Sequence, residues 1–242
     1  MQKPDNRVPL SRRGLLRRSA AVGGAATIVL GTGLAAAPAA GARENGRGNA
    51  PASGVGTVAY PLPDDENGFV RGGEVYHTDW SDSSPRPLAA HFPTLPKRFT
   101  DGVDAVYVLP GGLLGFVKDG EVHRTDWARG RARQLRGEFP TLPKSFTRGV
   151  DAAYVLPNGA HGFVRGGEVH HTDWAEGATR RLTDRFPTLP GHFASGLTGA
   201  YVRPNWVYTF VRGDEVHHTD LGRKAVRKLG DEFPELPESW RP

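Results

Sequence analysis

The sequence of 242 residues contains no cysteine. This absence excludes disulfides, cysteine nucleophiles, thiolate zinc sites and iron–sulfur clusters. Small secreted domains with thin cores often depend on disulfides, but a chain of this length can bury a sizeable core without them. We therefore expect a core large enough to stabilise the fold without cross-links.

The chain also lacks a long, strongly apolar run. The stretch from residue 20 to about residue 37 is rich in Gly and Ala and falls short of the ~20 strongly apolar residues of a membrane-spanning helix. It follows a twin-arginine pattern, Ser11-Arg12-Arg13-Gly14-Leu15-Leu16, and ends in small residues that suit a signal peptidase, with cleavage after Ala39 or Ala42. This segment is similar to a bacterial twin-arginine (Tat) export signal.

Residues 1–42 are therefore expected to be a Tat signal peptide, and the protein to be secreted after cleavage. A membrane anchor and a disordered basic tail are the alternatives for this segment. A Tat substrate normally folds in the reducing cytoplasm before export, which agrees with the absence of cysteine. Residues 43–56 have no apolar period and are rich in Gly, Ala, Asn and Arg, so we expect a flexible linker.

Excess charge of one sign is confined to this leader. The whole chain has 31 basic and 26 acidic residues, and residues 1–42 hold six of the basic ones and one of the acidic ones, which leaves 25 of each. A nucleic-acid-binding protein would present a basic face. The sequence thus predicts no nucleic-acid partner, and no membrane association after signal cleavage.

The rest of the chain consists of four copies of one unit, at residues 57–103, 104–150, 151–197 and 198–242. The period is 47 residues, as in Tyr60, Tyr107, Tyr154 and Tyr201. In the third copy, short β-prone runs at 152–156, 162–165, 168–174 and 180–182 are separated by turn residues, which predicts three or four antiparallel strands. A repeat of this length and content is typical of a propeller blade. We therefore expect an all-β, four-bladed β-propeller.

Two runs, Asp104-Ala105-Val106-Tyr107 and Asp151-Ala152-Ala153-Tyr154, open the second and third copies. Each is followed by Phe-Val-(Lys/Arg)-x-Gly-Glu-Val and closed by Phe-Pro-x-Leu-Pro. These units resemble haemopexin-type repeats, a family that forms four-bladed propellers, and the likeness covers residues 57–242. The Gly-His and Trp-Asp signature of WD repeats is missing, and four kelch units would normally leave a propeller unclosed.

The resemblance implies a cation in the central channel, either calcium or sodium, ringed by backbone carbonyl oxygens. Carried over to this chain, the ring is Thr57, Asp104, Asp151 and Thr198, and a second layer is Ala59, Val106, Ala153 and Ala200. Two ring positions hold Thr where the family has Asp, so two side-chain charges are lost. The alternative is a water-filled channel in which the Asp side chains cap turns.

Histidine recurs at two adjacent repeat positions. His77, His171 and His218 share one, and His123, His170 and His217 share the other. Imidazoles can bind haem or a transition metal, and His171 and His218 are the candidates. The alternative is a layer between blades in which the imidazoles are hydrogen-bonded.

Two further repeated sets have structural interpretations. The Glu directly after each two-residue hairpin turn is opposite a base at the end of the preceding strand, which predicts cross-strand pairs such as Arg165 with Glu168. Trp80, Trp127 and Trp174 are expected in the core between blades; exposed, they would form a platform for sugars or aromatic ligands.

No Gly-x-Ser-x-Gly elbow, His-Glu-x-x-His helix or phosphate loop is present. The copies differ most in the loops 81–86, 111–114, 158–161 and 205–208, where Trp206 and Tyr208 are unusual. The sequence therefore favours a secreted, non-enzymatic binding protein whose partner is a small molecule (haem, a metal or a polyamine) or an extracellular protein. The alternative is a secreted hydrolase with an unrecognised site at the channel mouth.

Overall fold

The structure is a computed structural model that describes residues 56–63, 66–82, 84–203, 205–222 and 225–241. The expected signal peptide and all of the expected linker except Gly56 lie outside these residues. No helix in the described part of the chain is long and apolar enough to cross a membrane.

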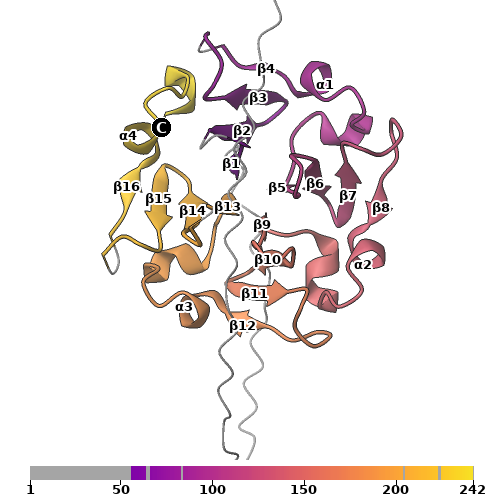
Figure 1. Cartoon of the computed structure of the whole chain (residues 1–242), viewed down its shortest axis with the longest axis vertical. Helices are drawn as coiled ribbons and strands as arrows, with labels where there is room; N and C mark the ends of the chain where they lie inside the picture. The colour runs from indigo at the N-terminus through magenta and orange to yellow at the C-terminus, as the bar shows by residue number, and fades with distance from the viewer. Residues whose placement is uncertain (1–55, 64–65, 83, 204, 223–224, 242) are drawn as a thin grey trace, which may run out of the picture. The chain divides into compact units, whose positions relative to one another are not determined.

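The described residues form four antiparallel sheets of four strands, and each sheet is one repeat. Figure 1 shows the sheets arranged radially, with β1, β5, β9 and β13 innermost. The blades comprise β1 (Thr57–Pro61), β2 (Asn67–Arg71), β3 (Glu74–His77) and β4 (Arg86–Pro87); β5 (Ala105–Val108), β6 (Leu114–Lys118), β7 (Glu121–Arg124) and β8 (Arg133–Gln134); β9 (Ala152–Val155), β10 (His161–Arg165), β11 (Glu168–His171) and β12 (Arg180–Arg181); β13 (Gly199–Val202), β14 (Tyr208–Arg212), β15 (Glu215–His218) and β16 (Arg227–Lys228). The predicted all-β, four-bladed propeller is confirmed.

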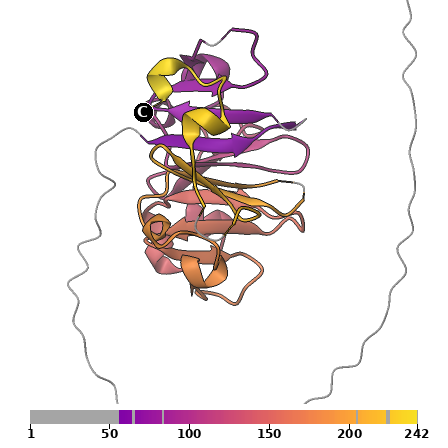
Figure 2. The same cartoon turned by 90° about the vertical axis from the view of Figure 1, so that its left-hand side faces the viewer.

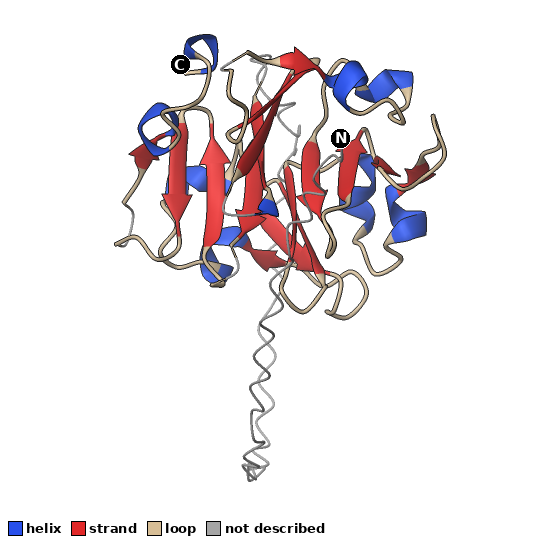
Figure 3. Ribbon diagram, turned by 45° about the horizontal axis from the view of Figure 1, so that its top comes forward, coloured by secondary structure: helices blue, strands red, loops and turns tan. Residues whose placement is uncertain are grey.

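The connectors that the sequence predicts as irregular contain single helical turns. Their proline residues and tight spacing allow one turn of α-helix and one of 3-10 helix in each copy, at the periphery of the blades (Figure 3). The α-turns are α1 (Leu88–His91), α2 (Leu135–Glu138), α3 (Leu182–Arg185) and α4 (Leu229–Glu232), and the 3-10 turns are Lys97–Phe99, Lys144–Arg148, Gly191–Ala194 and Glu238–Trp240. Seen from the side, the blades stand next to one another as a disc (Figure 2).

The second hairpin of each blade turns within two residues. Gly166 and Gly167 have φ angles of 56° and 80°, and Asp119 and Gly120 in the preceding copy have 50° and 77°. Two consecutive left-handed residues form the turn whose twist matches that of the flanking strands, which explains the glycines at this place.

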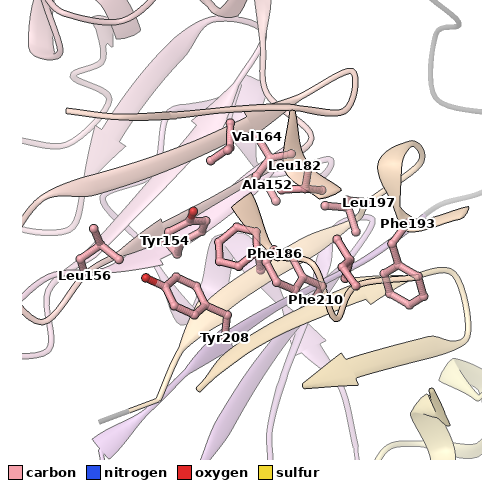
Figure 4. Close-up of a cluster of buried hydrophobic side chains, with 13 residues drawn as sticks. Ala152, Tyr154, Leu156, Val164, Leu182, Phe186, Phe193, Leu197, Tyr208 and Phe210 are labelled. Atoms are coloured by element: carbon pink, nitrogen blue, oxygen red, sulfur yellow. The ribbon is translucent and has the colours of Figure 1, made fainter. Parts of the chain in front are cut away.

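The hydrophobic cores lie between blades, because a blade cannot bury its own faces. Between the third and fourth blades, Tyr154 and Val164 pack with Ala200 and Phe210, and Phe186 of the connector closes the layer (Figure 4). The ring of Phe186 meets the ring of Phe210 edge-on at 4.9 Å. The same layer recurs at the other three junctions.

The repeated tyrosines lie flat across their blades. In the third copy, a Cβ added to Gly162 of β10 would stand 2.1 Å from the ring of Tyr154, and Gly68 and Gly115 show the same close approach to their tyrosines. Glycine is therefore required in the second strand because the aromatic ring occupies the space of a side chain. The fourth copy has Thr209 at this position.

The first and fourth blades close the ring without a shared strand. Phe69 of β2 meets Phe233 edge-on at 4.9 Å, and Trp240 is buried in the same core. Arg71 also donates a hydrogen bond of 2.8 Å to the carbonyl of Ser239. We call this contact between the two terminal blades the closing junction.

Candidate functional site

The principal candidate site is an apolar hollow at one end of the channel. It has a volume of about 340 Å³ and lies where the innermost strands end, so the loops that follow these strands form its rim. We call it the funnel; it is lined by residues 61–63, 106–110, 112, 153–157 and 200–203. Arg203 is the one charged residue in this lining, and the remainder is Leu, Val, Ala, Pro, Gly and Tyr.

The rim loops share one geometry. In each loop the N–H of the first residue donates to the carbonyl of the fifth, as from Leu109 to Leu113 and from Arg203 to Val207, at 2.8 and 2.9 Å. In the second, third and fourth loops the fourth residue is left-handed, with φ of 81° at Gly112, 85° at Gly159 and 64° at Trp206. The first three loops supply apolar or small residues to the funnel lining, and the fourth supplies Arg203.

A second, polar hollow of about 270 Å³ lies at the closing junction. It is lined by Glu66, Asn67, Thr78, Arg203, Glu232, Phe233 and Glu235. The repeat positions of Arg203 and Glu235 hold Leu109 and Thr141 at the junction of the second and third blades. At this junction a charged side chain thus replaces an apolar one at Arg203 and a hydroxyl at Glu235, and Arg203 lines both hollows.

A charged network underlies the polar hollow. Nε2 of His218 lies 2.8 Å from the carboxylate of Glu232, which also accepts hydrogen bonds from Arg227 at 2.7 Å and from Arg203 at 3.4 Å. Burial and the charge of Arg203 lower the pKa of His218. Burial alone would raise the pKa of Glu232, but its hydrogen bond from Arg227 and the nearby His218 hold it below its usual value.

Part of this network has a counterpart in the second blade. In the first three blades an arginine lies over a tryptophan, as Arg133 over Trp127 with the guanidinium carbon 4.4 Å from the ring centroid, and Arg133 also donates to Glu138 at 2.8 Å. The fourth copy has Leu221 at the tryptophan position, and Arg227 keeps the equivalent bond to Glu232. The three tryptophans are half-buried under these guanidinium groups, so the expected core position is only partly attained and no bare aromatic platform results.

Sequence reasoning missed one hydroxyl–imidazole–carboxylate arrangement. Nδ1 of His218 lies 2.8 Å from the hydroxyl of Thr209, so Thr209, His218 and Glu232 follow one another as in a nucleophile relay. Thr209 is fully buried at 0% exposure, which denies a substrate access to its hydroxyl. The sequence feature that could have revealed this arrangement is Thr209 itself, which stands at a repeat position where the other three copies have glycine.

The repeated histidines His123, His170 and His217 form clamps between blades. Nδ1 of His170 donates to the carbonyl of Ala178 at 2.7 Å, and its Nε2 lies 3.2 Å from the hydroxyl of Thr141 in the preceding connector. His123 and His217 repeat the arrangement with Thr94 and Thr188. Because a carbonyl can only accept a hydrogen bond, the neutral imidazole carries its proton on Nδ1, and Nε2 accepts a hydrogen bond from the threonine hydroxyl.

The predicted haem or metal ligands His171 and His218 are both 2% exposed. Nε2 of His171 is hydrogen-bonded to the hydroxyl of Tyr154 at 2.8 Å, as His77 is to Tyr60 at 2.7 Å. The two side chains belong to different blades and share no partner in the described structure. Ligation by either residue stays a prediction and would require these internal bonds to break.

The predicted carbonyl ring, Thr57, Asp104, Asp151 and Thr198, opens the four innermost strands at the channel end opposite the funnel. Oδ2 of Asp104 accepts the N–H of Asp119, and Oδ2 of Asp151 that of Gly166, each at 2.7 Å, so both carboxylates cap turns. Burial raises the pKa of both carboxyls. Among the residues described, no three or more His, Asp or Glu side chains are grouped to hold a metal.

A channel cation would therefore depend on backbone carbonyls, and the ring stays a prediction. The second layer, Ala59, Val106, Ala153 and Ala200, is buried between the blades, with side chains in the hydrophobic cores. Its side chains contribute no ligand atoms, so it too could serve an ion only through its backbone.

The predicted cross-strand ion pairs are wrong for three of the four blades. Their strand register is as expected, with Arg165 opposite Glu168, but the base donates instead to the carbonyl of Gly149 at 2.6 Å. Lys118 and Arg71 bind carbonyls of connectors in the same way. Of the four predicted hairpin pairs, all within the described residues, only Arg212 and Glu215 form an ion pair, with nitrogen and oxygen 3.9 Å apart. The hydrogen bond to the connector carbonyl is preferred because an exposed ion pair contributes little to the free energy of unfolding.

No model of a protein family matches the chain, and no curated protein sequence matches it. Several solved structures, however, are similar to it in fold. The hemopexin fold protein CP4 from cow pea is 16% identical, with 76% of this chain and 97% of that one covered and a TM-score of 0.62. LS24, a seed albumin from Lathyrus sativus, is 14% identical over 76% and 96%, also at 0.62. A plant lectin with two metal binding sites from Cicer arietinum is 16% identical over 73% and 94%, at 0.60.

These identities are too low to carry function from one chain to the other, and they show the fold alone. The chain has the haemopexin fold, as its four repeats indicate.

Proposed function

We propose that this protein is a non-enzymatic binding protein whose ligand site is the funnel, and that its ligand is an apolar small molecule. The observation that carries the proposal is the lining: one charged residue, Arg203, at the edge of an otherwise apolar hollow of about 340 Å³. Ligand sites are typically concave and mostly apolar, with few polar groups. The buried position of Thr209 argues against the hydrolase alternative.

Titration with the neutral fluorescent probe N-phenyl-1-naphthylamine tests this function. Its emission is expected to rise with saturation at micromolar concentration. Leu109→Arg copies into the second loop the charge that Arg203 has in the fourth, and it should weaken binding at least fivefold because an apolar wall becomes polar. Leu113→Arg is the matched control, since Leu113 lies in the same loop outside the lining. No saturable signal, or equal loss in both variants, overturns the proposal.

The funnel favours an apolar ligand over the polyamine and free metal that the sequence left open. Haem is tested separately by absorbance: a Soret shift that is lost in His171→Ala and His218→Ala supports ligation by these residues. An unchanged spectrum at micromolar haem excludes it.

We also propose a calcium or sodium ion in the channel, held by the carbonyls of Thr57, Asp104, Asp151 and Thr198. The plant lectin with two metal binding sites, which is similar in structure to this chain, supports this proposal. An ion that binds only the native state raises stability. Removal of calcium with a chelator, or of sodium by replacement with choline, should therefore lower the Tm; an unchanged Tm in both would contradict the ion.

Export by the Tat pathway and an extracellular small-molecule or protein partner complete the proposal, with neither nucleic acid nor membrane as a partner of the mature protein. The support is the N-terminal pattern and the balanced charge of residues 43–242. N-terminal sequencing of protein recovered outside the cell tests it: cleavage after Ala39 gives a mature N-terminus at Ala40, and cleavage after Ala42 gives one at Arg43. An uncleaved N-terminus would contradict it.

A further inference from the structure

Trp206 occupies a backbone conformation that tryptophan disfavours. Its φ of 64° is left-handed, and its N–H closes the turn by donating to the carbonyl of Arg203 at 3.0 Å. The same closing bond joins Gly112 to Leu109 and Gly159 to Leu156, at 3.1 and 2.8 Å. Two copies of this turn thus use glycine, which adopts the conformation freely, and the fourth copy uses the largest side chain.

The side chain of Trp206 also gains little from burial. It is 51% exposed, whereas the next two residues of its loop, Val207 and Tyr208, are each 8% exposed. The turn therefore neither requires a tryptophan nor buries it. A residue kept in an unfavourable conformation at the surface points to a role outside folding.

Trp206 lies in the fourth rim loop, beside the funnel lining, although it is not itself one of the lining residues. Gly112, its counterpart in the second loop, is part of the funnel lining, and Arg203 at the start of its own loop is another part. The Cα of Trp206 occupies the same position in its turn as the Cα of Gly112 does in the second loop. The flat indole of Trp206 is suited to contact with a planar aromatic surface, because aromatic rings pack edge to face or offset-stacked.

We propose that Trp206 is the specificity-determining residue of the funnel and that it selects ligands with a planar aromatic ring. This inference rests on the proposed function, because it assumes that the funnel is the ligand site. It adds the class of ligand and the residue that recognises it.

The test compares Trp206→Gly with Trp206→Phe, using N-phenyl-1-naphthylamine as the aromatic probe and 1-decanol, which displaces it, as the aliphatic one. Trp206→Gly should bind the aromatic probe about three- to tenfold more weakly and 1-decanol with unchanged affinity. Trp206→Phe should retain most of the aromatic affinity. The Tm of Trp206→Gly should rise by about 1–3 °C, because glycine relieves the left-handed backbone.

A tryptophan that served only the fold would behave in the opposite way, with a lower Tm and unchanged probe affinity in Trp206→Gly. That result, or an equal loss for both probes, overturns the inference. If the wild type binds neither probe, the funnel itself is not the site and the proposed function fails first. If Trp206→Gly binds the aromatic probe with wild-type affinity, the funnel is still the ligand site but Trp206 does not select its ligand. That result also overturns the inference.

Discussion

The side chain of Arg71 in the first blade donates a hydrogen bond of 2.8 Å to the carbonyl of Ser239, which lies 168 residues further along the chain. The corresponding bases of the second and third blades, Lys118 and Arg165, bind the carbonyls of Gly102 and Gly149. Arg212 of the fourth blade likewise donates to the carbonyl of Ser195 at 2.9 Å. The same interaction therefore joins each of these three blades to the connector that precedes it, and in the first blade it joins the two terminal blades.

Truncation before Phe233 is expected to abolish cooperative melting. It removes Phe233, Leu236 and Trp240 from the core of the closing junction, together with the acceptor of Arg71. The lost burial amounts to about 2 kcal/mol or more for each large side chain, comparable in sum to the stability of a domain. Calorimetry of the truncated chain checks this, and a sharp transition at the wild-type temperature would show that the last connector is dispensable.

Removing one clamp between blades should reveal its coupling energy. His170→Ala and Thr141→Val each break the hydrogen bond between the second and third blades, so their effects on the free energy of unfolding should be non-additive by about 0.5–1.5 kcal/mol. Denaturant unfolding of both single variants and the double variant measures the coupling. Thr147→Val, which removes a hydroxyl bonded to Lys144 in its own 3-10 turn, is the control and should be additive with His170→Ala.

Stability should fall as the pH is lowered from about 6.5 towards 4. Burial is the main cause that lowers the pKa of His77, His161 and His171 to about 4 in the folded protein. The unfolded chain, with histidine pKa near 6.5, then binds protons that the folded one does not, and the free energy of unfolding decreases by roughly 1 kcal/mol per pH unit for each residue. The slope of Tm against pH between 7 and 4.5 measures it.

His171→Gln should flatten this slope, because glutamine keeps a polar group beside Tyr154 without taking up a proton. Thr147→Val, which changes no titratable group, provides the control and should leave the slope as it is in the wild type. A slope that is unchanged in His171→Gln would mean that this imidazole does not contribute to the acid sensitivity.

Gly162→Ala should destabilise the protein by about 1–3 kcal/mol, because the new methyl group would stand 2.1 Å from the ring of Tyr154 and the ring cannot move out of the core. Gly191→Ala is the matched control: no atom lies within 4 Å of its added Cβ, and we expect a change close to zero. Equal stability of the two variants, measured in urea, would contradict the proposed packing of tyrosine on glycine.

The repeat period alone was enough to predict the propeller, because identical spacing of strands and turns leaves little choice of architecture. The hairpin glycines and the apolar run around Tyr154 also placed the first two strands of the third copy within one residue of their observed bounds. The third strand, predicted at 168–174, ends three residues earlier, at His171. The helical turns of the connectors were not predicted, since a single turn such as Leu182–Arg185 has no periodicity to read.

The site was less predictable. The repeated histidines and bases suggested ligands and ion pairs, yet His170 and Arg165 bind the carbonyls of Ala178 and Gly149. Which acceptor a side chain reaches depends on how blades pack, and a single sequence does not record that packing. The funnel arises from loops that sequence reasoning singled out only for their variation, in which Trp206 stood out.

The closing junction also has a consequence for assembly. Four nearly identical blades could join in the wrong order, for example as a ring of three in which the third blade meets the first. That ring would set Thr188 against Tyr76 where a histidine belongs, and would place Glu66 beside Leu156 instead of Arg203. Because the two terminal faces carry different chemistry from the internal ones, the chain specifies how many blades complete its circle.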